Sequence, residues 1–439
     1  MTKKQKIVYL YFILLPFIDV ITSLIVRFTD SKISIGSIVK GFTLLFGIIY
    51  TIFFSKSKLR KISIKYLLII TLFILLYIFT KYEIFSLFFF YNEINNIMHY
   101  FYFPLMIVGI FNYFDDIQIP NKHIEKVLFI NSICYSLLLL IPYAIGTSFN
   151  SYRWDNFFGN NGWFFSANEI GAITVILLSS TLYFLNYHNK KIILIVIPIL
   201  LSIILVGTKV SFLGMIIVVL LISIFYIIKE KEKNYFIPIF LIISLFILCT
   251  ISPTINNFNS SIDNLNLPED TNIENSKENN LITLKDLTDN KIIIDTCRLI
   301  FNEREDFFAN NFYVYSKSGV TNILFGIGWT NWSKYNYDYE RKLIEIDYLD
   351  IIIHYGVLGF IVYFAPAIYL LFNILKNKTK KGYYVWYNLI IFILGILISS
   401  IAGHVLSAPA VSIYLVLILY LIYNYKKGSY KNEKNSNIR

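Results

Sequence analysis

Charged residues are scarce in this sequence. Asp, Glu, Lys and Arg together make up 15% of its 439 residues, whereas a soluble domain carries about 25%. Hydrophobic residues make up 56%, and an apolar surface of that extent needs lipid to cover it. The composition therefore excludes an ordinary soluble enzyme and indicates an integral membrane protein.

Cysteine is equally rare, and its three positions follow no pattern. Cys134 and Cys249 lie in apolar runs, and Cys297 stands alone in a polar segment. We therefore expect neither a disulfide framework nor a zinc site, and no metal. Glycine-rich nucleotide-binding motifs are also missing, which argues against an ATP-driven enzyme.

The net charge of +11 could suggest nucleic acid as a partner, but the distribution of that charge does not. The basic residues form short clusters between apolar runs, as loops at a membrane surface do. The first apolar run lacks a small-residue cleavage site and is interpreted as a signal anchor. We expect membrane lipid, and no nucleic acid, to surround the chain.

Apolar runs of roughly 15 to 25 residues, a length that crosses a bilayer, recur along the chain. The twelve runs are 7–28, 33–54, 65–80, 98–114, 126–146, 168–187, 192–206, 208–228, 235–252, 348–375, 384–402 and 409–425. The sequence thus predicts an all-α polytopic membrane protein with about twelve transmembrane helices.

Lysine and arginine concentrate in alternate loops. Clusters within 56–65, 229–233 and 376–381 alternate with loops that hold few basic residues. By the positive-inside rule, these clusters and both termini, with the tail 426–439, lie in the cytoplasm. The abundance of Ile, Asn and Lys is typical of an AT-rich bacterial genome, so we expect a multi-pass protein of the bacterial cytoplasmic (inner) membrane.

One long polar segment, 253–346, interrupts the apolar pattern. It forms a large extracytoplasmic loop between helices one to nine (1–252) and helices ten to twelve (347–425). Residues 253–283 are rich in Asn, Ser, Asp and Glu and are interpreted as a mobile linker. Residues 284–316 regain helical periodicity, so the loop is expected to be partly helical.

A helix over 284–316 would carry an apolar face with Arg304 at its centre, and the neighbouring candidate Arg298 would fall off that face. An arginine on an apolar face must either snorkel to water or meet an anion. The apolar members of this face are Cys297, Ile300, Phe301, Phe307 and Phe308. The acidic side chains are expected to point elsewhere: Glu303, Glu305 and Asp306.

The stretch SYRWDNFFGNNGWFFSANEIGA, from Ser151 to Ala172, joins spans five and six on the outer face. Its Gly and Asn residues mark turns. Trp154 and Trp163 offer flat apolar surfaces, and Asn168 follows them. Two interpretations remain open, an interfacial aromatic belt and a loop that faces carbohydrate or lipid.

Three further charges lie at or within apolar runs. Lys209, in the stretch GTKVS, begins span eight at the outer interface. It either snorkels or binds phosphate at the helix N-terminus. Asp19 in span one and Lys40 in span two are opposite charges inside the membrane, and we expect them to pair within the bundle.

The last pattern runs through 324–360, where LFGIGW is followed by a polar segment and then EIDYLDIIIHYGVLGF. Glu345 and Asp347 enter span ten. Asp347, Asp350 and His354 share one helical face. Acids at a membrane boundary are costly unless they are used or paired, so this segment holds the best candidates for chemistry.

The stretches NGWFFSANEIGA, GTKVSFLG, an arginine before LFGIGW, and EIDYLDIIIHYGVLGF occur in this order. In that order they resemble the successive motifs of the O-antigen polymerase and O-antigen ligase family, and most of all its capsular and exopolysaccharide polymerase branch. The resemblance covers roughly 150–365. The predicted plan of twelve spans with a large outer loop also resembles the plan of this family. The resemblance implies a membrane-embedded, GT-C-like glycosyltransferase.

The resemblance also implies a substrate and roles for single residues. The donor would be undecaprenyl-diphosphate-linked glycan, bound by basic residues without a metal or cofactor. Lys209 stands where the family often has arginine, and Arg304 resembles the arginine of the outer loop. Arg298 and Arg153 are further diphosphate-binding candidates, and Trp154, Trp163 and Asn168 are candidates to face the glycan.

Ligases of the family place a histidine near the start of span ten. Here that position holds Glu345, and a histidine follows only later, at His354. This difference favours the polymerase branch. We predict Glu345 as the base that deprotonates the acceptor hydroxyl, since a partly buried carboxylate suits this task. Asp347 and His354 are the alternative catalytic residues.

The leading prediction is therefore a polysaccharide polymerase that transfers a growing glycan onto the next lipid-linked repeat unit. A ligase that moves finished glycan to a different acceptor is the first alternative. A lipid-linked oligosaccharide flippase, from another class, is the second, although flippases usually carry an internal repeat that is missing here. A chain-length regulator and a separate flippase are possible partner proteins.

Overall fold

The computed structural model describes residues 1–29, 34–81, 87–152, 157–188, 193–229, 236–265, 282–301, 304–329, 344–376, 383–401 and 403–436. Within these ranges every regular element is a helix, apart from one isolated antiparallel bridge between Asn150 and Asn160. The elements are α1 (Lys3–Thr29), α2 (Ile35–Ile49), the π-helix η1 (Tyr50–Phe54), α3 (Arg60–Thr80), α4 (Leu87–Tyr100), α5 (Tyr102–Ile117), α6 (Asn121–Ala144), α7 (Ala167–His188), α8 (Ile193–Leu205), α9 (Lys209–Lys229), α10 (Phe236–Thr250), α11 (Pro253–Leu265), α12 (Leu284–Leu287), α13 (Lys291–Phe301), α14 (Arg304–Lys317), α15 (Val320–Phe325), α16 (Asp347–Lys376), α17 (Tyr383–Ser399) and α18 (Pro409–Ser436). The predicted all-α class is confirmed.

Five of the described helical segments are long and apolar enough to cross a membrane: Lys3–Thr29, Ile35–Phe54, Arg60–Thr80, Asn121–Ala144 and Asp347–Lys376. The number rises to seven if two bent pairs, α4 with α5 and α10 with α11, each form one span. Every one of the twelve predicted runs lies on one of these segments or on a shorter apolar helix. A multi-pass membrane protein is therefore confirmed, and the number twelve stays a prediction.

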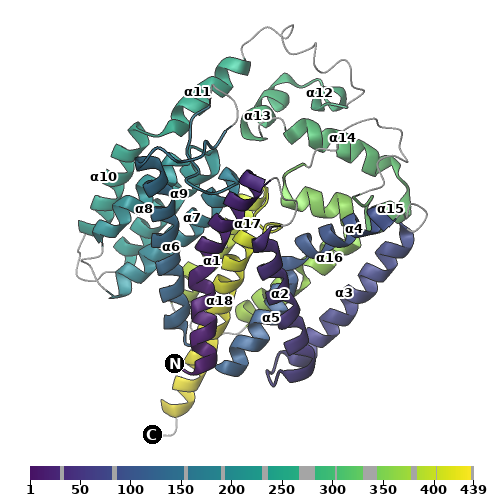
Figure 1. Ribbon diagram of the computed structural model, residues 1–439, viewed down its shortest axis with the longest axis horizontal. Helices are drawn as coiled ribbons and strands as arrows, with labels where there is room; N and C mark the ends of the chain where they lie inside the picture. Colours follow the sequence, from purple (N-terminus) through teal and green to yellow (C-terminus); the bar gives the residue numbers. More distant parts are fainter. Residues whose placement is uncertain are drawn as a thin grey trace.

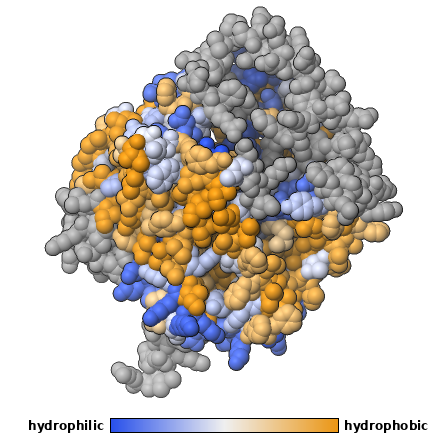
Figure 2. Space-filling view, viewed as in Figure 1, coloured by the Kyte–Doolittle hydropathy of each residue, from blue (hydrophilic) through white to orange (hydrophobic). Residues whose placement is uncertain are grey.

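The two ends of the helix bundle differ (Figure 1). Both termini lie at one end, and α11, α12, α13 and α14 lie at the other. Figure 2 shows a broad hydrophobic surface across the middle of the molecule, with hydrophilic residues gathered near the end that holds the termini. Many large apolar side chains on this surface are exposed, such as Phe246 at 75%, as lipid-facing side chains are.

Two helices form the centre of the bundle. In α7 every residue from 170 to 182 is buried, and in α18 every residue from 411 to 422 is buried. A helix that is apolar all round and buried on all sides belongs in a core. α7 packs against α6, α9 and α18, and Glu169 lies in its first turn.

The first half of the predicted linker, 253–283, is a helix rather than a mobile segment, which corrects the prediction. α11 begins at Pro253 and ends at Leu265, after a bend of 49° from α10. Proline is favourable in the first turn of a helix because it has no N–H to leave unpaired, and Asn257 anchors α11 through hydrogen bonds to Phe158 and Gly207. Residues 266–281 of the linker lie outside the described residues.

The predicted helix over 284–316 is broken into α12, α13 and α14, which corrects a second prediction. The side chain of Asn290 accepts hydrogen bonds from the N–H groups of Ile292 and Ile293, so it caps the start of α13. A further helix, α14, begins at Arg304, which therefore does not lie at the centre of one long face. Glu305 is buried rather than pointing outward, and Glu303 lies outside the described residues.

α16, which corresponds to the predicted span ten, is bent at Gly356. Gly356 has a φ of 72°, which is outside the helical range. A Cβ at Gly356 would lie 2.3 Å from the carbonyl oxygen of Leu324, so only glycine lets the LFGIGW segment approach. Ile327 and Gly328 then donate their N–H groups to the carbonyls of Ile353 and His354. The bend thus fixes the LFGIGW segment onto span ten.

α2 and α5 cross at a pair of glycines. A Cβ added to Gly109 would lie 2.9 Å from the Cα of Gly47, whereas one added to Gly41, also on α2, would meet nothing within 4 Å. We predict that Gly109→Ala lowers the thermal unfolding temperature in detergent, because the two helices must move apart. Gly41→Ala is the control and should be neutral or stabilising. Equal unfolding temperatures for the two variants would contradict this packing.

Candidate active site

Arg304 joins three parts of the chain. Its Nε and Nη2 donate hydrogen bonds to Oε2 of Glu345, at 3.1 and 2.9 Å, and its Nη1 donates to the carbonyl of Ile401 at 3.3 Å. The Arg304 side chain is 15% exposed and that of Glu345 37% exposed. One guanidinium therefore holds α14, the residues before α16 and the α17–α18 connection together.

Lys209 lies close to Arg304. It is the first residue of α9, whose N-terminus is capped by Thr208 through its hydrogen bond with the N–H of Ser211. The Lys209 ammonium lies 4.9 Å from the ring centre of Phe258, and the charges of Arg304 and of Glu305 both act on it, in opposite senses. Two basic residues from distant parts of the sequence thus converge at a helix N-terminus, a place where anions bind readily.

Tyr152 lies near this basic pair. Its hydroxyl donates to the carbonyl of Gly207 at 3.3 Å. Burial raises the pKa of Tyr152 to about 12, and the positive charge of Arg304 opposes that rise. The phenol is therefore neutral near pH 7, and it is an uncharged polar side chain beside the two cations.

Asp347 is fully buried and holds the loop before α18. Its Oδ1 accepts hydrogen bonds from the N–H of His404 (3.1 Å) and the hydroxyl of Ser407 (2.5 Å). Its Oδ2 accepts from the N–H groups of Val405 (2.8 Å) and Leu406 (2.7 Å). A catalytic role for Asp347 stays a prediction, but its oxygens are already engaged by this loop.

The backbone around Asp347 is unusual. Glu345 has a φ of 58° and His404 a φ of 54°, and few residues other than glycine adopt this left-handed conformation. Gly403 lies between the two: a Cβ there would be 1.7 Å from the carbonyl oxygen of Glu345. Strained residues of this kind cluster at active sites, and here two of them meet beside Arg304.

His354 is fully buried behind the LFGIGW segment. Its Nδ1 lies 3.1 Å from the carbonyl of Gly328, its Nε2 lies 3.7 Å from Oδ1 of Asp350, and its ring stacks on Trp329 at 3.9 Å. Its predicted catalytic role is not tested by these contacts. They place it within the packing that holds LFGIGW.

Two more buried charged residues, Glu93 and Lys81, bind the LFGIGW segment. Glu93 accepts hydrogen bonds from the N–H of Trp329 (2.6 Å) and the hydroxyl of Tyr77 (2.8 Å). Lys81 donates to the side chain of Asn322 and to the carbonyl of Gly326. Neither role could be predicted from the sequence, since both residues lie between apolar runs in a stretch that carries no motif.

The remaining predicted residues are spread around the site. Arg298 lies 4.0 Å from Glu305, and its side chain is 34% exposed. Trp163 is half-buried and donates its indole N–H to the hydroxyl of Thr147, and Asn168 is half-buried in the first turn of α7. Arg153 and Trp154 lie outside the described residues.

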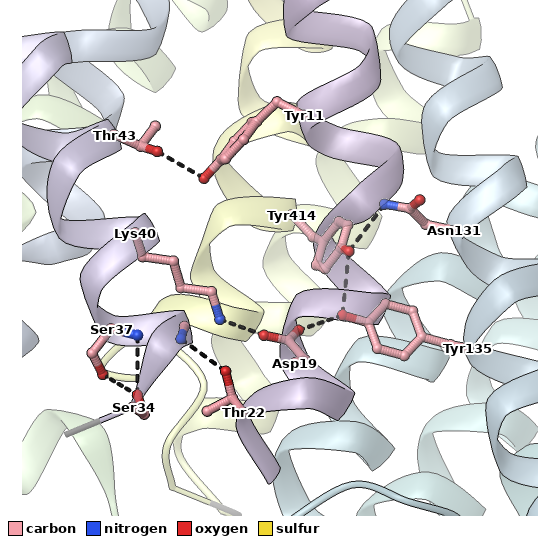
Figure 3. Close-up of polar contacts among 11 residues, drawn as sticks. Tyr11, Asp19, Thr22, Ser34, Ser37, Lys40, Thr43, Asn131, Tyr135 and Tyr414 are labelled. Atoms are coloured by element: carbon pink, nitrogen blue, oxygen red, sulfur yellow. Dashed lines mark hydrogen bonds and ion pairs between the residues drawn. The ribbon is translucent and has the colours of Figure 1, made fainter. Parts of the chain in front are cut away.

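The predicted pair Asp19–Lys40 is present. The ammonium of Lys40, on α2, lies 2.6 Å from Oδ1 of Asp19, on α1. Tyr135 of α6 donates to Oδ2 of Asp19 at 2.7 Å, and Tyr414 of α18 lies beside Tyr135 (Figure 3). This network binds four helices together in the interior of the bundle.

Further titratable side chains lie within range of the charges of this network. Glu169, in the first turn of α7, is half-buried and lies within range of the charges of His404, Lys40 and Asp19. His99, at the end of α4, lies within range of His404 and Lys40. Sequence analysis missed Glu169 and His404, because one lies inside an aromatic motif and the other in a short loop.

We predict that Asp347→Asn lowers the thermal unfolding temperature measurably. Each carboxylate oxygen accepts from two donors, so either orientation of an amide leaves donors facing its NH₂ group. Each buried donor left unpaired costs about 1–3 kcal/mol. Asp306→Asn is the matched control: Asp306 accepts one N–H, from Leu284 at 2.8 Å, and an amide oxygen can do the same. A smaller loss for Asp347→Asn than for Asp306→Asn would refute this role.

The sequence was also compared with known protein families, curated proteins and solved structures. Residues 1–428 match the sequence model of the family described as O-antigen ligase like membrane protein. No curated protein and no solved structure matches the chain. The match covers nearly the whole chain, and it includes every residue of the site described above. The chain therefore belongs to the family of O-antigen ligase-like membrane proteins.

Proposed function

We propose that this protein is a surface polysaccharide polymerase. It transfers a growing glycan from undecaprenyl diphosphate onto the next lipid-linked repeat unit, without a metal. The reaction takes place at the outer face of the bacterial cytoplasmic membrane. The chain crosses this membrane twelve times, with both termini in the cytoplasm and α11 to α14 outside. Membership of the O-antigen ligase-like family supports a lipid-linked polysaccharide substrate and a glycosyltransferase activity.

The observation that carries this proposal is the convergence of Arg304 and Lys209. The charge of Arg304 acts on Lys209, as does the opposite charge of Glu305, and Arg304 is paired with Glu345. Two cations in one region attract anions, and a leaving diphosphate is such an anion. When the glycosidic bond to the donor breaks, negative charge develops on the diphosphate, and two positioned cations stabilise it at the moment it appears.

Glu345 fits this scheme as the partner of Arg304 before substrate binds. Its carboxylate accepts two hydrogen bonds from the guanidinium, at 3.1 and 2.9 Å. A phosphate offers the same planar donor group a similar set of oxygens. We infer that the donor diphosphate replaces the Glu345 carboxylate on Arg304. The predicted role of Glu345 as the base requires that this exchange has taken place.

The polymerase is preferred to the ligase because Glu345 stands where ligases of the family carry histidine. The acceptor of a polymerase is a second lipid-linked repeat, so both substrates are held in the same membrane leaflet. A chain-length regulator and a separate flippase are the protein partners that such a reaction requires, one to limit the polymer and one to supply repeats from the cytoplasm.

We predict that the purified protein in lipid nanodiscs converts lipid-linked repeat units into a ladder of longer lipid-linked glycans. The substrate is extracted from a deletion strain, and the products are separated by size. A ligase would instead leave single repeats unchanged and transfer preformed polymer to another acceptor. A flippase would move lipid-linked repeats across liposomes without lengthening them. Either of these results would overturn the polymerase proposal.

We predict that Arg304→Ala lowers the elongation rate by about 10²–10³, the usual cost of losing one group that stabilises transition-state charge. Arg304→Lys should recover only part of the rate, because an ammonium cannot make the paired contact of a guanidinium. Arg298→Ala is the matched control, since this arginine is more exposed and lies on the neighbouring helix α13, and it should lose less than about tenfold. Equal rates in Arg304→Ala and Arg298→Ala, at equal protein levels, would exclude the role of Arg304.

A further inference from the structure

A groove of about 200 Å³ lies between α3, α5 and α16, and it includes no residue of the candidate active site. Its floor is buried and apolar, with Val108 and Phe111 of α5 and Leu370 of α16 all at most 4% exposed. Its edge is exposed, with Ile69 of α3 at 55% and Tyr369 of α16 at 38%. The groove is therefore open toward the surroundings of the bundle and is lined mainly by hydrocarbon.

The hydroxyl groups in the walls of the groove already have partners within the protein. Pro366 of α16 has no N–H to donate to the carbonyl of Val362, four residues earlier, and the hydroxyl of Tyr66 on α3 donates to that carbonyl instead, at 3.2 Å. The hydroxyl of Ser63, also on α3, accepts from the side chain of Asn112 on α5 at 2.7 Å. A ligand that enters the groove is therefore expected to be apolar along its buried part.

One cation belongs to this apolar groove. Among the described residues that line it, Lys65 alone carries a charge, and its side chain is exposed in the second turn of α3. Two acids, Asp115 and Asp116, lie at the end of α5, but they do not line the groove. Asp115 accepts from the hydroxyl of Ser57 at 2.8 Å, and Asp116 from the N–H of Lys56 at 2.9 Å. The groove itself therefore combines an apolar floor with a single positive charge.

The charged part of the groove lies at the end of the bundle that holds the termini (Figure 1). Gln5, near the N-terminus, donates to the carbonyls of Ile117 and Gln118 at the end of α5. The start of α3 lies at the same place, through the bonds just described. Residues 56–65 form one of the basic clusters that the proposed orientation places in the cytoplasm. Basic pockets between helices on this side of a membrane bind the head groups of anionic lipids.

The occupant must match both the apolar floor and the cation. An acyl chain enters such a groove without losing hydrogen bonds, but it meets equally apolar surroundings in the bilayer, so the groove alone gives little preference among lipids. Lys65 supplies the preference, because a lysine near the membrane surface attracts anionic head groups. We propose that the groove holds one acyl chain of an anionic phospholipid whose phosphate pairs with Lys65. Its place in the cytoplasmic leaflet rests on the proposed orientation of the chain.

Native mass spectrometry of the full-length protein in detergent tests the role of the charge. The probes are phosphatidylglycerol, which is anionic, and phosphatidylcholine, which is zwitterionic, with identical acyl chains. We predict that the wild-type protein binds phosphatidylglycerol about fivefold more tightly, the effect of one lysine beside an anionic head group, and that Lys65→Gln loses this preference. Lys61→Gln is the matched control, because Lys61 is exposed in the same basic cluster but does not line the groove. Its preference should stay within about twofold of wild type.

Photolabelling tests the place of the acyl chain. Phosphatidylglycerol that carries a photoactivatable group on one acyl chain should label the segments 107–111 of α5 and 365–370 of α16. Ala365→Leu should lose most of this labelling, because the larger side chain fills part of the groove. An unchanged unfolding temperature in lipid-free detergent confirms that Lys65→Gln and Ala365→Leu still fold. Added phosphatidylglycerol should then raise this temperature more for the wild type than for either variant, since a ligand stabilises the state that binds it.

Three results would overturn the site. The first is equal binding of the two phospholipids by the wild type, or an undiminished preference in Lys65→Gln. The second is displacement of the label from the groove by undecaprenyl phosphate but not by an excess of phosphatidylglycerol, which would assign the groove to a polyprenyl chain. The third is cross-linking of the groove to a second copy of the chain. None of these measurements depends on glycosyl transfer, so a failure of the proposed function is distinguishable from a failure of this site.

Discussion

The buried carboxylate of Asp347 is the contact on which the arrangement of the site depends. It accepts four hydrogen bonds from residues 404–407, far away in the sequence, and so fixes the α17–α18 loop against the start of α16. A buried charge is tolerated only when it is satisfied in this way. Through it the left-handed residues Glu345 and His404 are brought together, and Arg304 binds across both segments.

Charge is balanced almost residue by residue within the membrane part of the structure. Lys40 pairs with Asp19, and Glu93 is satisfied by the N–H of Trp329 and the hydroxyl of Tyr77. At the end of the bundle that holds α14, Arg304 pairs with Glu345, and the charges of Arg304 and Glu305 both act on Lys209. Two basic residues from distant parts of the sequence therefore gather in one region. This convergence argues for anion binding there more strongly than either basic residue does alone.

Part of this could be predicted from the sequence. Opposite charges in adjacent apolar runs must meet, so Asp19 and Lys40 could be paired in advance. Periodicity alone could not show that Asn290 would cap a new helix, because capping competes with a repeat that continues through it. Nor could it distinguish α7 and α18, which are buried on every side, from helices that face lipid, since both are equally apolar. The packing of residues 403–407 against Glu345 and Asp347 could not be predicted either, because the two segments are far apart in the sequence.

The two parts of the candidate site belong to different packing clusters. Lys209 and the loop of His404 belong to helices of the main core, whereas Arg304 begins α14, which packs through a small separate cluster that includes Val314, Tyr315 and Ile353. Elements with few apolar contacts move at lower cost than a core does. The ion pair with Glu345 is therefore a substantial part of what keeps α14 in place. If diphosphate takes over Arg304, as proposed, it replaces one anchor with another, so the outer loop stays docked through the exchange.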